Sequence, residues 1–374
     1  MEKIDYDWKK LKKRYIGLDF LKIISIFTIC AFHTTIHLGA NYGVLQQMLS
    51  VGSVFMTAFF ILSGYFLFVN YSSENMIKIS NFKRFLIKRF IGIIPMYYIA
   101  AIFFILFSLI LYKFFGIGNM SIYHEIFLAP AEILGIQVNF HSLFWYSHNS
   151  GTWFISCILM CYIVFPFIQE IVKQISTKTK IILCAIIIII LFYSPILEII
   201  FPITGIYANP FFRILEFSLG IIIASMKPVL DKNEFVKKYI YNIWSVLLIN
   251  VIMVICVSIA VNSNIYTSNV MLYSIICLPC FIVMVIGLSG LNSKKLEASP
   301  VVKYCVNIGY VFFLAQLYSN TISKIIINKL NIQNNIIIIL IGWGTCIIIS
   351  VILHELFEKP IKRFLSNKLK RITD

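Results

Sequence analysis

The sequence predicts an all-α fold, a polytopic bundle of about ten transmembrane helices with both termini in the cytoplasm. Its 374 residues are 60% hydrophobic and only 13% charged, whereas a typical soluble domain is about 45–50% apolar and about 25% charged. The apolar residues form continuous runs of about 20 residues, the length that a membrane-spanning helix requires. Strands of a membrane barrel would alternate over about ten residues instead. This composition excludes a soluble enzyme, a disordered protein and a nucleic-acid-binding protein.

The apolar runs also predict how the chain is divided. A basic cytoplasmic segment (1–15) precedes a membrane domain (16–358), and a basic cytoplasmic tail (359–374) follows it. The predicted spans within the membrane domain are 16–38, 46–70, 90–112, 152–172, 181–201, 208–226, 241–262, 270–290, 304–323 and 334–357.

The net charge of +16 supports this topology. With a cytoplasmic N-terminus, 27 of the 32 Lys and Arg residues lie in cytoplasmic segments or at their borders. On the other side lie only Lys113, Lys324 and Lys329. Such an excess of basic residues in cytoplasmic loops is typical of multi-pass membrane proteins. Most of the charge therefore indicates orientation.

The first span carries the densest set of ionisable residues, namely Asp19, Lys22, His33 and His37. At about 100° per residue these four fall within an arc of about 60°. His33 lies about 16 Å deeper along the helix axis than Lys22. Ionisable groups inside a membrane are costly and commonly functional. A snorkelling lysine and a histidine bonded between helices are the structural alternatives.

Three further groups of charged residues are candidates. Arg84 and Arg89 stand at the cytoplasmic entry of the third span, where they suit either topology or phosphate binding. Arg213 and Glu216 in the sixth span have the spacing of an ion pair on one helix face, which is either structural or part of a polar cavity. Glu358 ends the last span on the cytoplasmic side.

The segment 113–151, on the predicted external side, is rich in aromatic and histidine side chains. Among them are Phe140, His141, Trp145, Tyr146 and His148. Two interpretations stay open: a re-entrant or interfacial segment that lines an external acceptor site, or an aromatic belt at the lipid headgroups.

From Gly17 to about Leu365 the chain resembles the acyltransferase-3 family of bacterial integral-membrane acyltransferases, which includes polysaccharide O-acetylases. The motifs that carry the resemblance are Lys22 followed by His33, the FFILSGYF text at 59–66 that contains Ser63, Arg84 and Arg89 before Pro95, Trp153 with Ser156, Arg213 before Gly220, and Glu358 before Pro360. The chain departs from the family pattern in two respects. Ile158 and Leu159 stand where many members carry acids, and Gln316 replaces a histidine.

The resemblance implies an enzyme of the bacterial plasma membrane that moves an acyl group, with acetyl expected, from cytoplasmic acyl-CoA to a hydroxyl of a cell-surface glycan or envelope precursor. His33 would be the general base, since a perturbed imidazole is the usual choice. Arg213 would stabilise the oxyanion, while Lys22, Arg84 and Arg89 would hold the phosphates of CoA. The predicted supporting residues are Asp19, His37, Ser63, Trp153, Ser156, Glu216 and Glu358.

No metal and no permanently bound cofactor is expected; acetyl-CoA or another acyl-CoA is a co-substrate. The expected partners are this donor, the glycan or envelope acceptor and membrane lipid, with no nucleic acid. Two alternatives stay open on the sequence. One is a proton-coupled transporter or flippase, because buried charges and proline-containing spans suit a carrier equally. The other is a non-catalytic membrane domain of the acyltransferase type.

Overall fold

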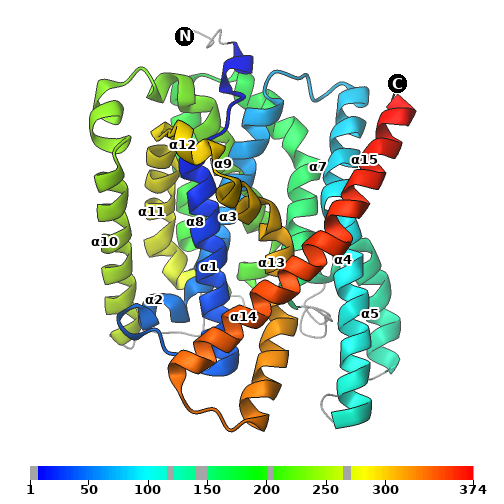
Figure 1. The fold of residues 1–374 in the computed structure, drawn as a ribbon. Helices are drawn as coiled ribbons and strands as arrows, with labels where there is room; N and C mark the ends of the chain where they lie inside the picture. Colours follow the sequence, from blue (N-terminus) through cyan, green and yellow to red (C-terminus); the bar gives the residue numbers. More distant parts are fainter. Residues whose placement is uncertain (1–6, 116–121, 140–149, 201–204, 264–270, 374) are drawn as a thin grey trace.

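The protein is a bundle of long helices. The computed structural model describes residues 7–115, 122–139, 150–200, 205–263 and 271–373, and in this part of the chain every regular element is a helix. The long helices that cross the bundle (Figure 1) are α1 (Ile16–Leu38), α3 (Phe55–Tyr71), α4 (Ile79–Phe115), α7 (Trp153–Gln174), α8 (Thr177–Ile200), α9 (Pro210–Leu230), α10 (Ile243–Asn262), α11 (Met271–Gly290), α13 (Pro300–Lys329) and α14 (Asn335–Leu353).

Short helices connect these crossings. They are η1 (Trp8–Leu11), η2 (Gly43–Leu45), α2 (Gln46–Ser50), η3 (Gly52–Val54), α5 (Ile122–Leu134), η4 (Gln137–Asn139), η5 (Ser150–Thr152), η6 (Ile206–Ala208), η7 (Val236–Ile240), α12 (Lys294–Ala298), η8 (His354–Glu358) and α15 (Lys359–Thr373).

The predicted class, a polytopic helical membrane bundle, is confirmed. Nine helices in the described residues are long and apolar enough to cross a membrane. The predicted span 208–226 corresponds to α9, which is 21 residues long but carries Arg213, Glu216 and Lys227. All three charged side chains are buried within the bundle, so α9 crosses among other helices rather than against lipid.

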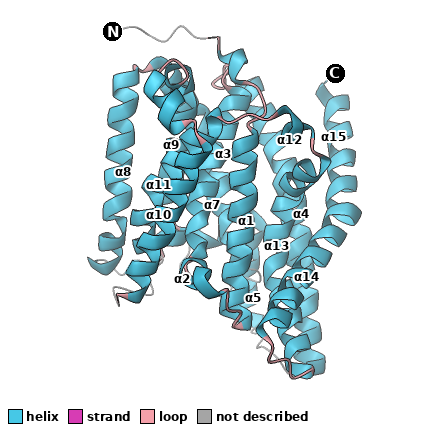
Figure 2. Ribbon diagram, turned by 60° about the vertical axis from the view of Figure 1, so that its left-hand side comes forward, coloured by secondary structure: helices cyan, strands magenta, loops and turns pink. Residues whose placement is uncertain are grey.

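Both ends of the described chain lie at the same end of the bundle. Figures 1 and 2 place the N-terminal segment and the end of α15 together. This arrangement requires an even number of crossings and agrees with ten. We call this end the terminal end and the other the distal end. That the terminal end faces the cytoplasm stays a prediction.

Local sequence signals set the ends of the helices. The Asn209 side chain accepts a hydrogen bond from the Phe211 N–H at 2.9 Å, and Pro210 is the first residue of α9. Asparagine at an N-cap satisfies an exposed N–H, and proline suits the first helical position because it has none. At the other end of α1, Gly39 adopts the left-handed conformation with φ of 70°, as many helix C-termini require.

A close crossing of α3 and α9 forms the tightest contact of the core. A Cβ on Gly64 would lie 1.9 Å from the Phe217 carbonyl oxygen, and a Cβ on Gly220 would lie 1.9 Å from the Ile61 carbonyl oxygen. Each helix therefore uses a glycine to admit the backbone of the other, the arrangement that small residues allow in membrane bundles.

The helices α1 and α13 run in parallel, because both begin at the terminal end (Figure 1). The Lys22 ammonium donates to the Val306 carbonyl at 3.3 Å, and His37 shares a cavity with Asn320. In both pairs, the difference in residue number between the α13 residue and the α1 residue is the same to within one. This register places His33 at the level of Gln316.

Three predicted boundaries differ from the structure. The predicted span 46–70 is divided into α2, η3 and α3. The basic run with Arg84 and Arg89 is part of α4, which begins at Ile79 rather than near residue 90. The predicted tail 359–374 continues α14 through η8 as the helix α15. Of the aromatic residues named in segment 113–151, Phe140, His141, Trp145, Tyr146 and His148 lie outside the described residues, so both interpretations of this segment stay predictions.

Candidate active site

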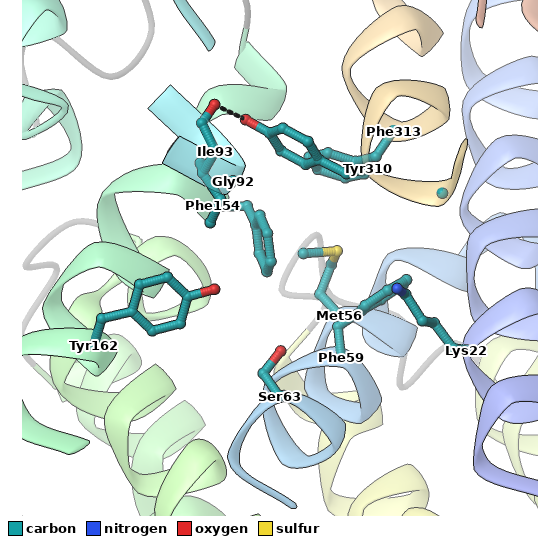
Figure 3. Close-up of a pocket in the computed structure, with 11 residues that line it drawn as sticks. Lys22, Met56, Phe59, Ser63, Gly92, Ile93, Phe154, Tyr162, Tyr310 and Phe313 are labelled. Carbon is teal, nitrogen blue, oxygen red and sulfur yellow. Dashed lines mark hydrogen bonds between the residues drawn. The ribbon is translucent and has the colours of Figure 1, made fainter. Parts of the chain in front are cut away.

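Lys22 reaches a cavity of about 180 Å³ between α1, α3, α4, α7 and α13. In Figure 3 its ammonium group faces the same space as the hydroxyl groups of Ser63 and Tyr162. Aromatic side chains, including Phe154 and Tyr310, form most of the remaining wall. The cavity therefore offers one cation and two hydroxyl groups in an otherwise apolar environment, the usual composition of a site for a small molecule.

Neither Arg89 nor Arg84 lines this cavity, but Arg89 lies next to one of its walls. The Arg89 guanidinium lies 5.2 Å from the ring centroid of Tyr71 and 5.9 Å from that of Tyr162, which also lines the cavity. Its Nε is buried without a hydrogen-bond partner. Arg84 is exposed, because five residues along a helix turn a side chain by roughly 140°. The two arginines therefore do not form one phosphate clamp.

Two acidic residues predicted to support the site, Asp19 and Glu358, have cationic partners of their own. The Asp19 carboxylate accepts a hydrogen bond from Arg14 Nε at 2.6 Å. Glu358 is buried, pairs with the His354 ring and accepts from Lys362 Nζ at 2.5 Å. The hydrogen bond described for the Lys22 ammonium group goes to the Val306 carbonyl instead of to either carboxylate.

His33 lies deeper on the same face of α1. Its ring stacks on that of His37, with centroids 5.6 Å apart and an interplanar angle of 8°. The Nδ1 atom of His33 is buried without a hydrogen-bond partner. At the same level of α13 the Gln316 side chain is 2% exposed, and both polar atoms of its amide lack a partner. An unpaired buried polar atom is rare and costly, so this level of the bundle is a candidate for bound substrate.

A second cavity, of about 330 Å³, lies beside His37 at the distal end. Its other walls come from α13, among them Asn320, Thr321 and Lys324. The sequence analysis did not identify this site, although Gln316, Asn320 and Lys324 follow one another at intervals of four residues, which places them along one helix face.

Arg213 and Glu216 lie in a closed cluster apart from both cavities. One guanidinium nitrogen of Arg213, NH1, donates to the two carboxylate oxygens of Glu216 at 2.8 and 2.6 Å. Its Nε donates to the Tyr207 carbonyl at 2.7 Å. Thr57 donates to Glu216 at 2.8 Å and so connects α3 with α9. The predicted ion pair is confirmed, and its geometry favours the structural interpretation. The oxyanion role of Arg213 stays a prediction.

The two predicted residues of the fourth span also face this region. The Trp153 ring centroid lies 5.4 Å from the Arg213 guanidinium and 4.8 Å from the Tyr207 ring. The Ser156 hydroxyl donates to Gln137 Oε1 at 3.2 Å. Neither residue lines the cavity at Lys22, so both support the helix packing around it.

Comparison with protein families matches residues 15–355 to an acyltransferase domain, the acyltransferase-3 domain. The chain belongs to the acyltransferase-3 family. This match covers nearly the whole chain and all ten crossings. Comparisons with curated proteins and with solved structures returned no match.

The structure explains two of the motifs that the chain shares with the acyltransferase-3 family. In the FFILSGYF text, Ser63 faces the cavity while Gly64 admits α9. The Arg213 and Gly220 motif supplies the opposite side of the same crossing. One motif therefore combines a group of the site with the packing that positions it.

Proposed function

We propose that this membrane acyltransferase moves an acyl group, expected to be acetyl, from acyl-CoA at the terminal end to a hydroxyl of a cell-surface glycan or envelope precursor. In this proposal the protein resides in the bacterial plasma membrane with its terminal end in the cytoplasm. The family supports acyl transfer in general. The donor, the acceptor and the base are proposed from the arrangement of α1 and its neighbours.

The terminal-end cavity would receive the donor. Lys22 and Arg89 provide cationic groups for the CoA phosphates, and cations at a protein surface bind phosphate through charge-assisted hydrogen bonds. The apolar wall around Phe154 and Tyr310 suits the pantetheine arm and the thioester. Arg84 is exposed on the same helix at a different angle, so we assign it a lesser part, in the first encounter with the anionic donor.

His33 would be the general base. The acceptor hydroxyl gives its proton to the His33 ring, and its oxygen forms a bond to the acyl carbonyl carbon. The C–S bond then breaks, and the CoA thiolate takes the proton back from the ring. The products are an ester and free CoA, so no further reactant is required. A well-placed base of this kind accelerates such a reaction by about 10²–10⁴-fold.

One observation carries the proposal. A single face of α1 brings Lys22 to a cavity at the terminal end, His37 to a cavity at the distal end, and His33 between them with a buried nitrogen that lacks a partner. In this proposal the two reactants would approach from opposite sides of the membrane and meet at the His33 imidazole.

The test measures release of free CoA from acetyl-CoA by the purified protein in nanodiscs, with and without glucose, glucuronic acid and N-acetylglucosamine as acceptors. We expect His33→Gln to lower the rate by about 10²–10⁴-fold while thermal unfolding stays unchanged. The matched variant His37→Gln should retain more activity. Full activity of His33→Gln would refute the role of His33. Failure to bind acetyl-CoA, together with uptake of a sugar into vesicles, would show the carrier instead.

A further inference from the structure

The distal cavity has the chemistry of a binding site. Its lining residues come from α1 and α13, and the segments that carry them lie toward the end of the bundle opposite to the termini (Figure 1). Three features define what it would bind: a buried amide oxygen without a partner, an exposed ammonium group, and a histidine ring that reaches the proposed base.

The Asn320 side chain supplies the first feature. It is 2% exposed and lines the cavity. Its Nδ2 donates to the Gln316 carbonyl at 2.7 Å, whereas its Oδ1 has no hydrogen-bond partner. A buried acceptor of this kind loses the full free energy of its hydration unless a donor reaches it. A hydroxyl group is such a donor, so Asn320 indicates a hydroxylated ligand.

Lys324 supplies the second feature. It follows Asn320 by one helical turn, lines the same cavity and is exposed. The cavity-lining residues in the described part of the chain include no Asp or Glu, so no carboxylate there neutralises its charge. The local charge favours an anionic ligand. An ammonium group recognises a carboxylate or a phosphate equally well.

His37 supplies the third feature, a connection to the reaction. It lines the cavity and stacks on His33. His37 therefore links the cavity to the proposed base. The Gln316 amide is buried without partners at the level of His33, one helical turn from Asn320 along α13.

We propose that the distal cavity is the acceptor site and that it selects a sugar or polyol that carries an anionic group, a carboxylate or a phosphate, near the hydroxyl to be acylated. This inference rests on the proposed function for the identity of the reaction. The binding chemistry itself follows from Asn320 and Lys324.

The experiment measures binding by isothermal titration calorimetry, with the full-length protein in phosphatidylcholine nanodiscs. The probes are glucuronic acid, glucose 1-phosphate and uncharged glucose, so the first two distinguish a carboxylate from a phosphate. Because a hydrogen bond to a charged group contributes about 1.5–3 kcal/mol, at least one anionic probe should bind about tenfold or more tightly than glucose.

Variants assign this preference to the cavity. Lys324→Gln should remove the preference for the anionic probe, and Lys324→Glu should reverse it. The matched control is Lys329→Glu, a charge reversal nearby on α13 outside the cavity, which should leave the preference intact. Thermal unfolding of each variant verifies folding. Equal binding of glucose and both anions, or an unchanged preference in Lys324→Gln, would overturn the proposal.

Together with the CoA-release assay, this binding experiment separates the inference from the proposed function. Binding that depends on Lys324, without release of CoA from acetyl-CoA, would refute acyl transfer and keep the site. Release of CoA together with binding that is insensitive to Lys324 would keep acyl transfer and refute the site.

Discussion

The Arg213–Glu216 cluster and the polar face between α1 and α13 both place ionisable or polar groups inside the bundle, but they differ in how these groups are satisfied. In the first, the guanidinium and the carboxylate form two hydrogen bonds, the Tyr207 carbonyl accepts from Arg213 Nε, and Thr57 donates to Glu216. In the second, His33 Nδ1 and the Gln316 amide have no partner. The ion pair of the first cluster is satisfied within the protein, whereas the second leaves hydrogen-bonding groups without a protein partner.

This difference distinguishes a structural ion pair from the groups that we propose to be functional. A buried ion pair with all its hydrogen bonds gains nothing from a substrate, and the loss of one member leaves an uncompensated charge. Unpaired buried groups weaken the fold by themselves. They are retained where a substrate, water or proton visits the site. Three predictions test this comparison, in addition to the measurements on His33 and Lys324.

The largest effect is expected at Glu216. Its replacement in Glu216→Leu removes the carboxylate that pairs with the buried Arg213 guanidinium and should destabilise the protein by about 3–5 kcal/mol, measured as thermal or chemical unfolding in detergent. The double variant Arg213→Met with Glu216→Leu should recover much of this loss, since well-packed apolar residues can replace a buried pair. If the double variant is folded but inactive, Arg213 takes part in catalysis and the comparison fails.

A smaller effect is expected where α3 crosses α9. Gly64→Ala places a Cβ 1.9 Å from the Phe217 carbonyl oxygen, so the helices must separate, at a cost of about 1–3 kcal/mol. The matched control is Gly344→Ala in α14, where a Cβ would meet nothing within 4 Å. The control should unfold at the same or a slightly higher temperature. Equal stability of the two variants would show that the crossing is less close than described.

The smallest effect distinguishes the two arginines of α4. Arg89→Gln removes a cation next to Tyr162 and the donor cavity, so the KM for acetyl-CoA should rise about tenfold, the loss expected for one charge-assisted contact. Arg84→Gln, on an exposed face of the same helix, should change KM by less than about threefold, as surface charges contribute little. Steady-state kinetics of CoA release measures both. An equal effect of the two substitutions would place the donor along the outside of α4.

Much of the fold follows from the sequence because the bilayer imposes it. A chain in lipid must satisfy its backbone within helices, so apolar runs of about 20 residues locate the crossings almost directly. The helix period alone aligns Asp19, Lys22, His33 and His37 on one face. The same period places Arg84 and Arg89 on different faces of a helix, but this applies only once both are known to lie inside α4.

The sequence by itself determined the class of the protein, the crossings, its family resemblance and the polar face of α1. Each of these depends on short-range periodicity or on local sequence motifs. The tertiary structure alone decided which polar groups have partners. Arg213 finds Glu216, Tyr207 and Thr57, whereas His33 comes level with an unpaired Gln316 through the parallel register of α1 and α13. Partnership between helices far apart in sequence depends on their packing geometry, and that geometry separates a stabilising charge from a candidate catalytic group.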